Sequence, residues 1–460
     1  MTSLIGTTLL GSQFIADPNF KEWMKIDRVV MGETSKFGYR SGQNKDIGSL
    51  LRQLLNDPVV VVCLYNWSTG NYYLKSGFDM NSSTDSAVNA SYTTFIVIPR
   101  VQSSFLKTVA PSASIPTPTT SKFVKWNASL RQFTIDNKKW SLLGANCYWL
   151  GLHETGEYPL KAQITEMFTI TNKMAGTVIR SHTLGISSGK PNSLRPYNNN
   201  LNDLAWDSID FALSQAKATG IKVIPVLLDE WYWYNGNYGD FCNTRGVDKS
   251  AFWTNLDVRN DFKDFLFKWL NHINKYTGVA NKNCPEIAIL ELGNELGNSS
   301  VRISQDNISI PPKEWTTDIT KYIKSIDQNH LVLCGSDECL GSKISDDFSV
   351  PQLDVYSAHF YWNDTNRLDF GSKKAYSLGK PYIIGEYDSG FGQDWYNQIA
   401  SRPEVSGLIM WGLYPSIDGN LNSPPLIHND GSTINWGDPK LLLISNNFRK
   451  IQGLPTVWSL

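Results

Sequence analysis

The chain of 460 residues has no long run of lysine or arginine, and its formal net charge is only -1. Nucleic-acid binding depends on clustered positive charge, so we expect no nucleic-acid partner. No apolar stretch reaches the roughly 20 residues that a membrane-spanning helix needs, so we expect no membrane span. The first residues, "MTSLIGTTLLGSQF", also lack the cationic front and the small-residue cleavage site of a secretory signal.

Patterns typical of metal sites are scarce as well. The 6 cysteines contain no CxxC pair, which argues against a zinc site. The 6 histidines offer no pair at i and i+4, and the acidic stretch "DEWYWYNGNYGD" does not have EF-hand spacing. We therefore expect neither a metal nor a cofactor. Cys334 and Cys339 are close enough along the chain to form a local disulfide, and free buried thiols are the alternative.

Length and composition predict two units. A chain this long exceeds one ordinary domain unless it contains a barrel of about 250 residues or more. Residues 108–121, "TVAPSASIPTPTTS", hold three prolines among small polar residues, which is typical of a linker. This segment separates a small unit, residues 1–107, from a large unit, residues 122–460.

The first unit contains short β-prone runs at 58–67, 71–78 and 91–100, separated by glycine, asparagine and serine. One helix is expected near 47–55. These features predict a small β-rich domain, in which no residue pattern indicates catalysis. Enzymes that act on polymers often carry an accessory domain, so binding to carbohydrate or to another protein is one hypothesis. A purely structural role is the alternative.

The second unit alternates apolar runs with amphipathic segments. A typical amphipathic segment is "LAWDSIDFALSQAKATG", which ends at Gly220 and predicts a helix. Eight strands, most of them followed by a helical segment, predict a (β/α)8 barrel. A doubly wound open sheet is the competing fold, but no glycine-rich phosphate loop follows the first strand. The runs suited to buried parallel strands are 141–149, 175–181, 221–229, 286–295, 331–336, 353–361, 381–387 and 406–414.

Polar and aromatic residues follow these strands at the carboxyl ends, where barrel enzymes carry their chemistry. Burying a polar side chain costs free energy unless it has hydrogen-bond partners. One such residue alone therefore indicates only a hydrogen-bonded side chain at the rim of the barrel. Two glutamates accompanied by arginine, asparagine, histidine and tyrosine indicate catalysis. In chain order the strand-end residues are Asn146, Trp149, Arg180, His182, Asp229, Glu230, Trp231, Asn294, Glu295, His359, Tyr361, Glu386 and Trp411.

Glu295 and Glu386 match the needs of two-carboxylate glycoside cleavage. One carboxyl group must carry a proton for the leaving oxygen, and the other must stay ionised beside the anomeric carbon. Glutamates at the ends of strands four and seven could hold their carboxyl groups about 5–5.5 Å apart, the separation of a retaining enzyme. Arg180 would keep Glu386 ionised through a charge-assisted hydrogen bond.

We also predict the contacts of three more residues. Tyr361 would donate a hydrogen bond to the nucleophile, and His359 would lie near the acid. Asn294 would reach the 2-hydroxyl of the sugar, whose hydrogen bond strengthens in the transition state.

These motifs resemble glycoside hydrolase family 5, in the clan of barrels called clan A, and within it the endo-β-1,4-mannanases. The resemblance covers about residues 121–450, and its set of motifs is specific because the pieces occur in order on the predicted strands. The matching pieces are "GNE" at 293–295, "HFY" at 359–361, "IGEY" at 384–387, Arg180 on strand two and Trp411 on strand eight.

The resemblance implies that Glu295 is the acid/base and Glu386 the nucleophile of a retaining double displacement. It further implies a β-1,4-linked polysaccharide substrate, with mannan as the expected one. We also expect an extracellular location. Alternatives are a β-glucan- or cellulose-active enzyme, a transglycosylating relative, or a non-catalytic carbohydrate-binding barrel. The resemblance implies that Trp411 is a platform under the sugar. The full set of strand-end residues expected to contact the sugar is Asn146, Trp149, Arg180, His182, Trp231, Asn294, His359, Tyr361 and Trp411.

Two stretches depart from that family pattern. The mannanase-like "NEPR" is "NELG" here, at 294–297, and the loop "DEWYWYNGNYGDFCNTRG" after strand three is individual to this chain. Such loops determine which sugar a barrel accepts.

Overall fold

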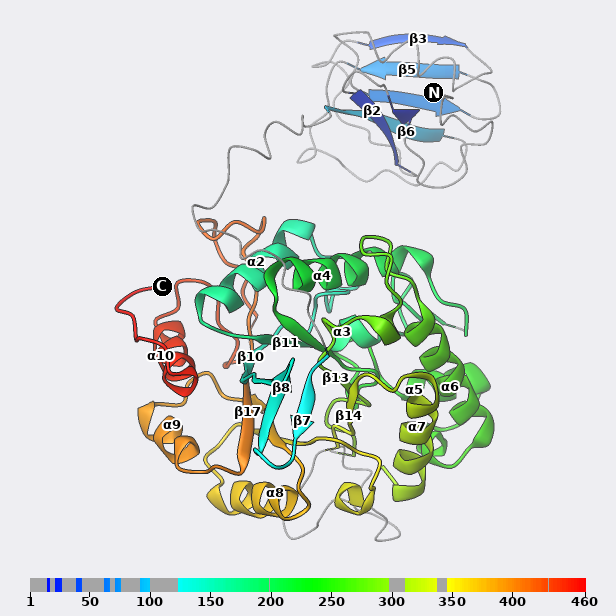
Figure 1. The fold of residues 1–460 in the computed structure, drawn as a ribbon. Helices are drawn as coiled ribbons and strands as arrows, with labels where there is room; N and C mark the ends of the chain where they lie inside the picture. Colours follow the sequence, from blue (N-terminus) through cyan, green and yellow to red (C-terminus); the bar gives the residue numbers. More distant parts are fainter. Residues whose placement is uncertain are drawn as a thin grey trace. The chain divides into compact units, whose positions relative to one another are not determined.

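The computed structural model describes residues 123–460 except 198, 298–310, 337–345 and 429, together with the backbone of six strands nearer the N-terminus. The chain divides into two compact units, Met1–Ser114 and Ile115–Leu460 (Figure 1). The predicted linker at 108–121 and the helix expected near 47–55 lie outside the described residues.

The first unit contains a six-stranded sheet with the strand order β1-β2-β6-β4-β5-β3. All of its strand pairs are antiparallel. β4, β5 and β6 lie within the three predicted runs, whereas β1, β2 and β3 were not predicted because their sequences lack long apolar runs. The strands are β1 (Ile15–Ala16), β2 (Lys21–Ile26), β3 (Tyr39–Gln43), β4 (Val62–Asn66), β5 (Asn71–Lys75) and β6 (Tyr92–Pro99).

Eight parallel strands of the second unit form a closed barrel, as the sequence predicted. β10 pairs with both β11 and β17, so the first and last strands are neighbours. Parallel bridges at Val223–Ile287 and Leu333–Val355 connect the remaining segments of the ring. The open-sheet alternative is therefore wrong. The strands are β10 (Leu142–Asn146), β11 (Val178–Ser181), β12 (Lys222–Pro225), β13 (Ile289–Glu291), β14 (Leu331–Leu333), β15 (Tyr356–Phe360), β16 (Tyr382–Tyr387) and β17 (Val405–Met410).

Helices form the outer layer of the barrel (Figure 1). In α7 the apolar residues Trp315, Ile319 and Ile323 recur every four positions and are buried, as expected for a surface helix that packs on a sheet. α4 ends at Gly220 in a left-handed conformation with φ 74°, which glycine adopts without strain. The main helices are α2 (Lys161–Lys173), α4 (Trp206–Thr219), α6 (Leu256–Asn271), α7 (Lys313–Ile326), α8 (Thr365–Ser377), α9 (Gln393–Ala400) and α10 (Lys440–Gln452).

Shorter helical elements lie in the connections. They are α3 (His182–Gly185), η3 (Asp203–Ala205), α5 (Gly239–Arg245), η4 (Lys249–Trp253), η5 (Asn281–Asn283) and η7 (Asp346–Ser349). Within the part of the chain that the structure describes, no helix has the length and apolar character needed to cross a membrane.

The bottom of the barrel is closed by a three-stranded antiparallel sheet of β7 (Lys125–Asn127), β8 (Gln132–Ile135) and β9 (Lys138–Lys139). Val124 and Phe133 from this segment are buried in one cluster with apolar residues on or beside every barrel strand. The barrel residues of that cluster are Leu142, Val178, Ile224, Ala288, Ile289, Leu331, Leu333, Val355, Ile383 and Ile409. Because this end is filled with apolar side chains, the polar strand-end residues gather at the other end.

Cys147, Cys242, Cys284 and Cys334 are free and buried. Of the two alternatives for Cys334, the free thiol is therefore the one that the structure supports. Cys339 lies outside the described residues.

Candidate active site

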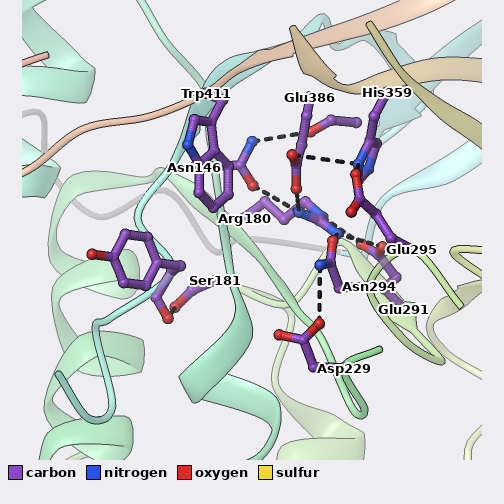
Figure 2. A network of polar contacts seen from close by, with 12 residues as sticks. Asn146, Arg180, Ser181, Asp229, Glu291, Asn294, Glu295, His359, Glu386 and Trp411 are labelled. Carbon is purple, nitrogen blue, oxygen red and sulfur yellow. Dashed lines mark hydrogen bonds and ion pairs between the residues drawn. The ribbon is translucent and has the colours of Figure 1, made fainter. Parts of the chain in front are cut away.

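A buried arginine connects the carboxyl ends of four strands. Arg180 on β11 is 1% exposed and donates to both carboxylate oxygens of Glu291 on β13 at 2.7 Å. It also donates to Glu386 on β16 at 2.7 Å and to Asn146 on β10 at 2.9 Å (Figure 2). A bidentate pair between arginine and carboxylate fixes the plane of the guanidinium. Arg180 therefore determines where the Glu386 carboxylate lies.

Two asparagine side chains complete this network. Asn146 donates to the carbonyl oxygens of Gly385 at 3.0 Å and Met410 at 3.1 Å, which ties β10 to β16 and β17. Asn294 accepts from Arg180 at 2.8 Å and donates to Asp229 at 3.1 Å. Burial raises the pKa of Asp229 well above its usual value, against the hydrogen bonds from the Trp231 backbone and from Asn294.

Glu295 is held by two donors and an unusual backbone conformation. Its φ of 49° lies in the left-handed region, which a non-glycine residue adopts at a cost of about 1 kcal/mol or more and which clusters at functional sites. His359 Nδ1 lies 2.8 Å from Glu295 Oε1, and Trp231 Nε1 donates to Glu295 Oε2 at 2.7 Å. The predicted sugar-binding residue Trp231 thus contacts the expected acid directly.

The two expected catalytic carboxylates face one another. One oxygen of Glu295, one oxygen of Glu386 and a ring nitrogen of His359 all lie within 4.8 Å of one another. Tyr361 donates its hydroxyl to Glu386 Oε2 at 2.5 Å, and His359 Nδ1 lies 3.4 Å from the same oxygen. The predicted contacts of Arg180, Tyr361 and His359 with the two glutamates are therefore present.

A cleft of about 220 Å³ opens above these residues. Trp411 lies at one of its walls, and the indole nitrogen of Trp411 donates to Asp430 at 2.5 Å. The cleft is lined by Trp231, Trp233, Tyr234, Asn294, Glu295, Tyr361, Glu386, Trp411 and Asp430.

Burial and mutual contact shift the pKa of all three central groups. Burial raises the pKa of Glu386, and the nearby Glu295 adds to this, against the cations His359 and Arg180. Burial would also raise the pKa of Glu295, but the hydrogen bond and charge of His359 bring that pKa below its usual value. Burial would lower the pKa of His359, and the carboxylates of Glu386 and Glu295 raise it above its usual value instead.

The resting proton therefore belongs to His359 and not to the expected acid, Glu295. A hydrogen bond of 2.8 Å joins the two side chains, so the proton titrates as a property of the pair. Transfer across that bond would place it on Glu295, where a leaving oxygen needs it. The same nitrogen and carboxylate oxygens are of the kinds that ligate cations, and a cation bound there would displace this proton.

In a His359→Asn variant, we therefore expect the pH range in which kcat/KM is high to become narrower at both its acid and its alkaline end. Without the nearby cation, the pKa of Glu386 rises, so the acid limb moves to higher pH. The remaining proton sits on a carboxyl group alone, which loses it at lower pH than a histidine does, so the alkaline limb moves down. The measurement is kcat/KM for an aryl glycoside as a function of pH.

His272→Asn is the matched control. His272 stacks on Trp206 and contacts Asp210 outside the cleft, so both limbs should stay in place. An alkaline limb that His359→Asn leaves unchanged would contradict the shared proton.

Five of the predicted sugar-binding residues do not line the cleft: Asn146, Trp149, Arg180, His182 and His359. Trp149 is fully buried; its indole nitrogen donates to the carbonyl of Leu413, and its ring stacks on His153. The structure gives Trp149 a packing role and corrects the expectation that it binds substrate. His182 is also buried and packs edge-on against Trp411 at 5.8 Å between ring centroids, so it supports Trp411 and does not line the cleft.

Some functional residues were missed by the sequence analysis. Glu291 lies inside an apolar run, and a charged residue in such a run needs a buried partner. Tyr234 lines the cleft from a long loop, and no sequence periodicity signals its position.

Comparison with known proteins gives a consistent result. Residues 121–364 match the family model described as GH family 5 beta-mannosidase-like. The chain is 28% identical over 382 residues to the putative mannan endo-1,4-beta-mannosidase 4 of Arabidopsis thaliana, covering 70% of this chain and 89% of that protein. It is 28% identical over 349 residues to mannan endo-1,4-beta-mannosidase 5 of the same plant, covering 64% and 79%.

Solved structures show the same fold. The endo-1,4-beta-mannanase from Rhizomucor miehei superposes with a TM-score of 0.57 at 21% identity, covering 72% of this chain and 99% of that one. A glycoside hydrolase family 5 mannosidase from the same fungus also gives a TM-score of 0.57, at 19% identity, covering 73% and 99%.

Proposed function

Because the chain belongs to glycoside hydrolase family 5, in its beta-mannosidase-like group, we propose that it hydrolyses the β-1,4 linkages of mannan with retention of anomeric configuration. One observation carries this proposal. The carboxylates of Glu295 and Glu386 come within 4.8 Å across the mouth of the barrel, and a retaining enzyme needs a separation of about 5–5.5 Å between its carboxyl groups.

In the first step Glu386 is the nucleophile. Its carboxylate forms a bond to the anomeric carbon while the glycosidic bond breaks and its electron pair moves to the leaving oxygen. Glu295 supplies the proton to that oxygen. Arg180 and Tyr361 each bind a different oxygen of Glu386, which holds the carboxylate in place without adding a negative charge.

In the second step Glu295 is the general base. It takes a proton from a water molecule, whose oxygen bonds to the anomeric carbon as Glu386 leaves. Trp231 and His359 hold the Glu295 carboxylate at its two oxygens in both steps. Trp411 offers an aromatic face to the sugar ring at the cleft wall, and Asn294 lies beside Arg180 for the 2-hydroxyl.

Mannan is the proposed polysaccharide because the two similar plant proteins described above carry the name mannan endo-1,4-beta-mannosidase. An extracellular location is proposed with it, because mannans are large polymers that the enzyme must meet outside the cell. For the first unit we retain the proposal that its sheet binds carbohydrate or another protein.

The test is incubation of the purified protein with mannan, glucomannan, cellulose and xylan, followed by chromatography of the released sugars. Release of mannose or mannose oligomers from mannan, faster than release of sugars from cellulose and xylan, is the expected result. NMR of the first product should show the β-anomer. Preferred release from cellulose would support the β-glucan alternative, products longer than the substrate would support transglycosylation, and no release from any glycan would contradict the function.

A further inference from the structure

Trp411 offers one face of its indole to the cleft, and its aromatic neighbours restrict the plane of the ring. The side chain is 4% exposed and lines the cleft. Tyr148 stacks on it with ring centroids 5.6 Å apart and planes 15° from parallel, and His182 packs edge-on at 5.8 Å. Because Tyr148 stacks on one face, the opposite face is the one available to a sugar ring.

The indole nitrogen of Trp411 is bound by a carboxylate that is itself fixed. Trp411 Nε1 donates to Asp430 Oδ2 at 2.5 Å, and the hydroxyl of Thr433 donates to the same oxygen at 2.6 Å. The backbone amides of Ser432 and Thr433 donate to Asp430 Oδ1 at 3.0 and 2.7 Å. These donors fix the Asp430 carboxylate, and the carboxylate in turn fixes the direction of the indole N–H.

A charged histidine supports this carboxylate from its other side. His428 Nδ1 lies 3.1 Å from Asp430 Oδ2, and His428 Nε2 lies 3.1 Å from Glu154 Oε2. Burial would lower the pKa of His428, but its contacts with Asp430 and Glu154 raise that pKa to about 9. Burial would raise the pKa of Asp430, but its contacts with His428 and Thr433 bring that pKa below its usual value. At neutral pH, His428 is therefore a cation between two carboxylates.

These contacts form a closed ring that begins and ends at Trp411. Tyr148 donates its hydroxyl to Glu154 Oε2 at 3.3 Å and stacks with its ring on Trp411. Trp411 is thus connected to Asp430, Asp430 to His428, His428 to Glu154, and Glu154 to Tyr148. The indole cannot tilt without breaking either its hydrogen bond or its stacking contact.

The orientation of the indole matters because a sugar changes shape during glycoside cleavage. Its ring flattens toward a half-chair or boat as positive charge develops at the anomeric carbon. An aromatic face supports that shape only when it lies along the flattened ring. A misplacement of about 1 Å in a site of this kind can lower the rate on the order of 10²-fold.

We propose that Asp430 and His428 are positioning residues for Trp411, which hold the free face of the indole in the orientation that the sugar ring needs in the transition state. This inference rests on the proposed function, because it requires that Trp411 meets a sugar. Asp430 acts through the indole N–H, and His428 acts through Asp430. Neither residue needs to contact the substrate for this role.

A double-mutant cycle between Asp430 and Trp411 tests the proposal in the full chain. Trp411→Phe keeps an aromatic face but lacks the N–H that Asp430 binds. The measurement is kcat/KM for a dinitrophenyl β-mannoside, whose activated leaving group keeps slow variants measurable. Asp430→Ala should lower kcat/KM on the order of 10²-fold in the wild type. In the Trp411→Phe background it should lower kcat/KM by less than about threefold, because the bond that it removes is already absent.

An equal loss in both backgrounds would overturn the proposal, because a general loss of folded enzyme does not depend on the indole N–H. Absence of hydrolysis of both mannan and the dinitrophenyl β-mannoside by the wild type would instead contradict the proposed function.

His428→Ala gives a second cycle that does not depend on how Asp430→Ala folds. Because the Asp430 carboxylate keeps its backbone donors, we expect a smaller loss of kcat/KM, roughly tenfold in the wild type and less than about twofold in Trp411→Phe. The same factor in both backgrounds would show that His428 does not act through the indole.

Asp418→Ala is the matched control for both cycles. Asp418 lies in the same loop after β17 and accepts from the amide of Asn420 and the hydroxyl of Ser423 in an exposed turn. Its kcat/KM should stay within about twofold of the wild type. Circular dichroism checks that each variant is folded. A loss for Asp418→Ala as large as that for Asp430→Ala would overturn the specific role of Asp430.

Discussion

Replacing Glu386 with glutamine is expected to abolish turnover, with kcat reduced on the order of 10⁵-fold or more, as for other nucleophile deletions. An amide cannot form the ester to the anomeric carbon, so the hydrolysis of natural glycans and the hydrolysis of activated aryl glycosides should both be lost. The measurement is steady-state hydrolysis of an aryl β-mannoside and of mannan by the purified variant.

The fold of this variant should survive the change. Glu291 already pairs with Arg180 through both of its oxygens, so removing the charge of Glu386 does not leave the buried guanidinium unpaired. The exposed residue Glu314 on α7 provides the matched control, because Glu314→Gln should keep full activity. A folded Glu386→Gln variant with activity within tenfold of the wild type would contradict the assignment.

Glu295→Ala is expected to have an effect that depends on the leaving group. A sugar leaves poorly without a proton, so hydrolysis of mannan should fall roughly 10²–10⁴-fold. A dinitrophenyl leaving group needs no proton, so the first step with a dinitrophenyl β-mannoside should proceed near its normal rate. The enzyme should then accumulate as the glycosyl ester, because water lacks its general base.

Azide provides a second readout for this variant. As an anion it needs no general base, so added azide should raise the turnover of the dinitrophenyl substrate and yield a mannosyl azide with the β-configuration. The Glu386→Gln variant should gain nothing from azide. Equal losses on mannan and on the dinitrophenyl substrate, with no azide effect, would show that Glu295 is not the acid/base.

The barrel was predictable because its strands are buried on both faces. Near-continuous apolar runs therefore identify them, and the carboxyl ends of parallel strands meet at one edge. The residues of β2, Lys21–Ile26, mix three charged with three apolar side chains and form no continuous apolar run, since a strand in an antiparallel sheet can have one polar face. Sequence periodicity thus locates the barrel strands better than the strands of the first unit.

Within the site, the positions of the residues that follow Asn146 do not come from strand alternation, because β10 ends at Asn146. Tyr148 follows that strand end in a turn and stacks on Trp411. Trp149 lies one position further and points into the packing layer, where it contacts Leu413. The pairing of Arg180 with Glu291 joins residues 111 positions apart, and the contacts of Tyr234 depend on a long loop. Neither follows from local sequence.

The central claim is that Glu386 bonds to the sugar while Glu295 faces it across the cleft. The most direct measurement is mass spectrometry of peptides after inactivation with 2-deoxy-2-fluoro-β-mannosyl fluoride. Fluorine at C2 slows both steps by destabilising positive charge at the anomeric carbon, and the fluoride leaving group lets the first step occur, so the ester accumulates. We predict one fluoromannosyl group per chain, on Glu386. A label on Glu295 or on any other residue would contradict the account.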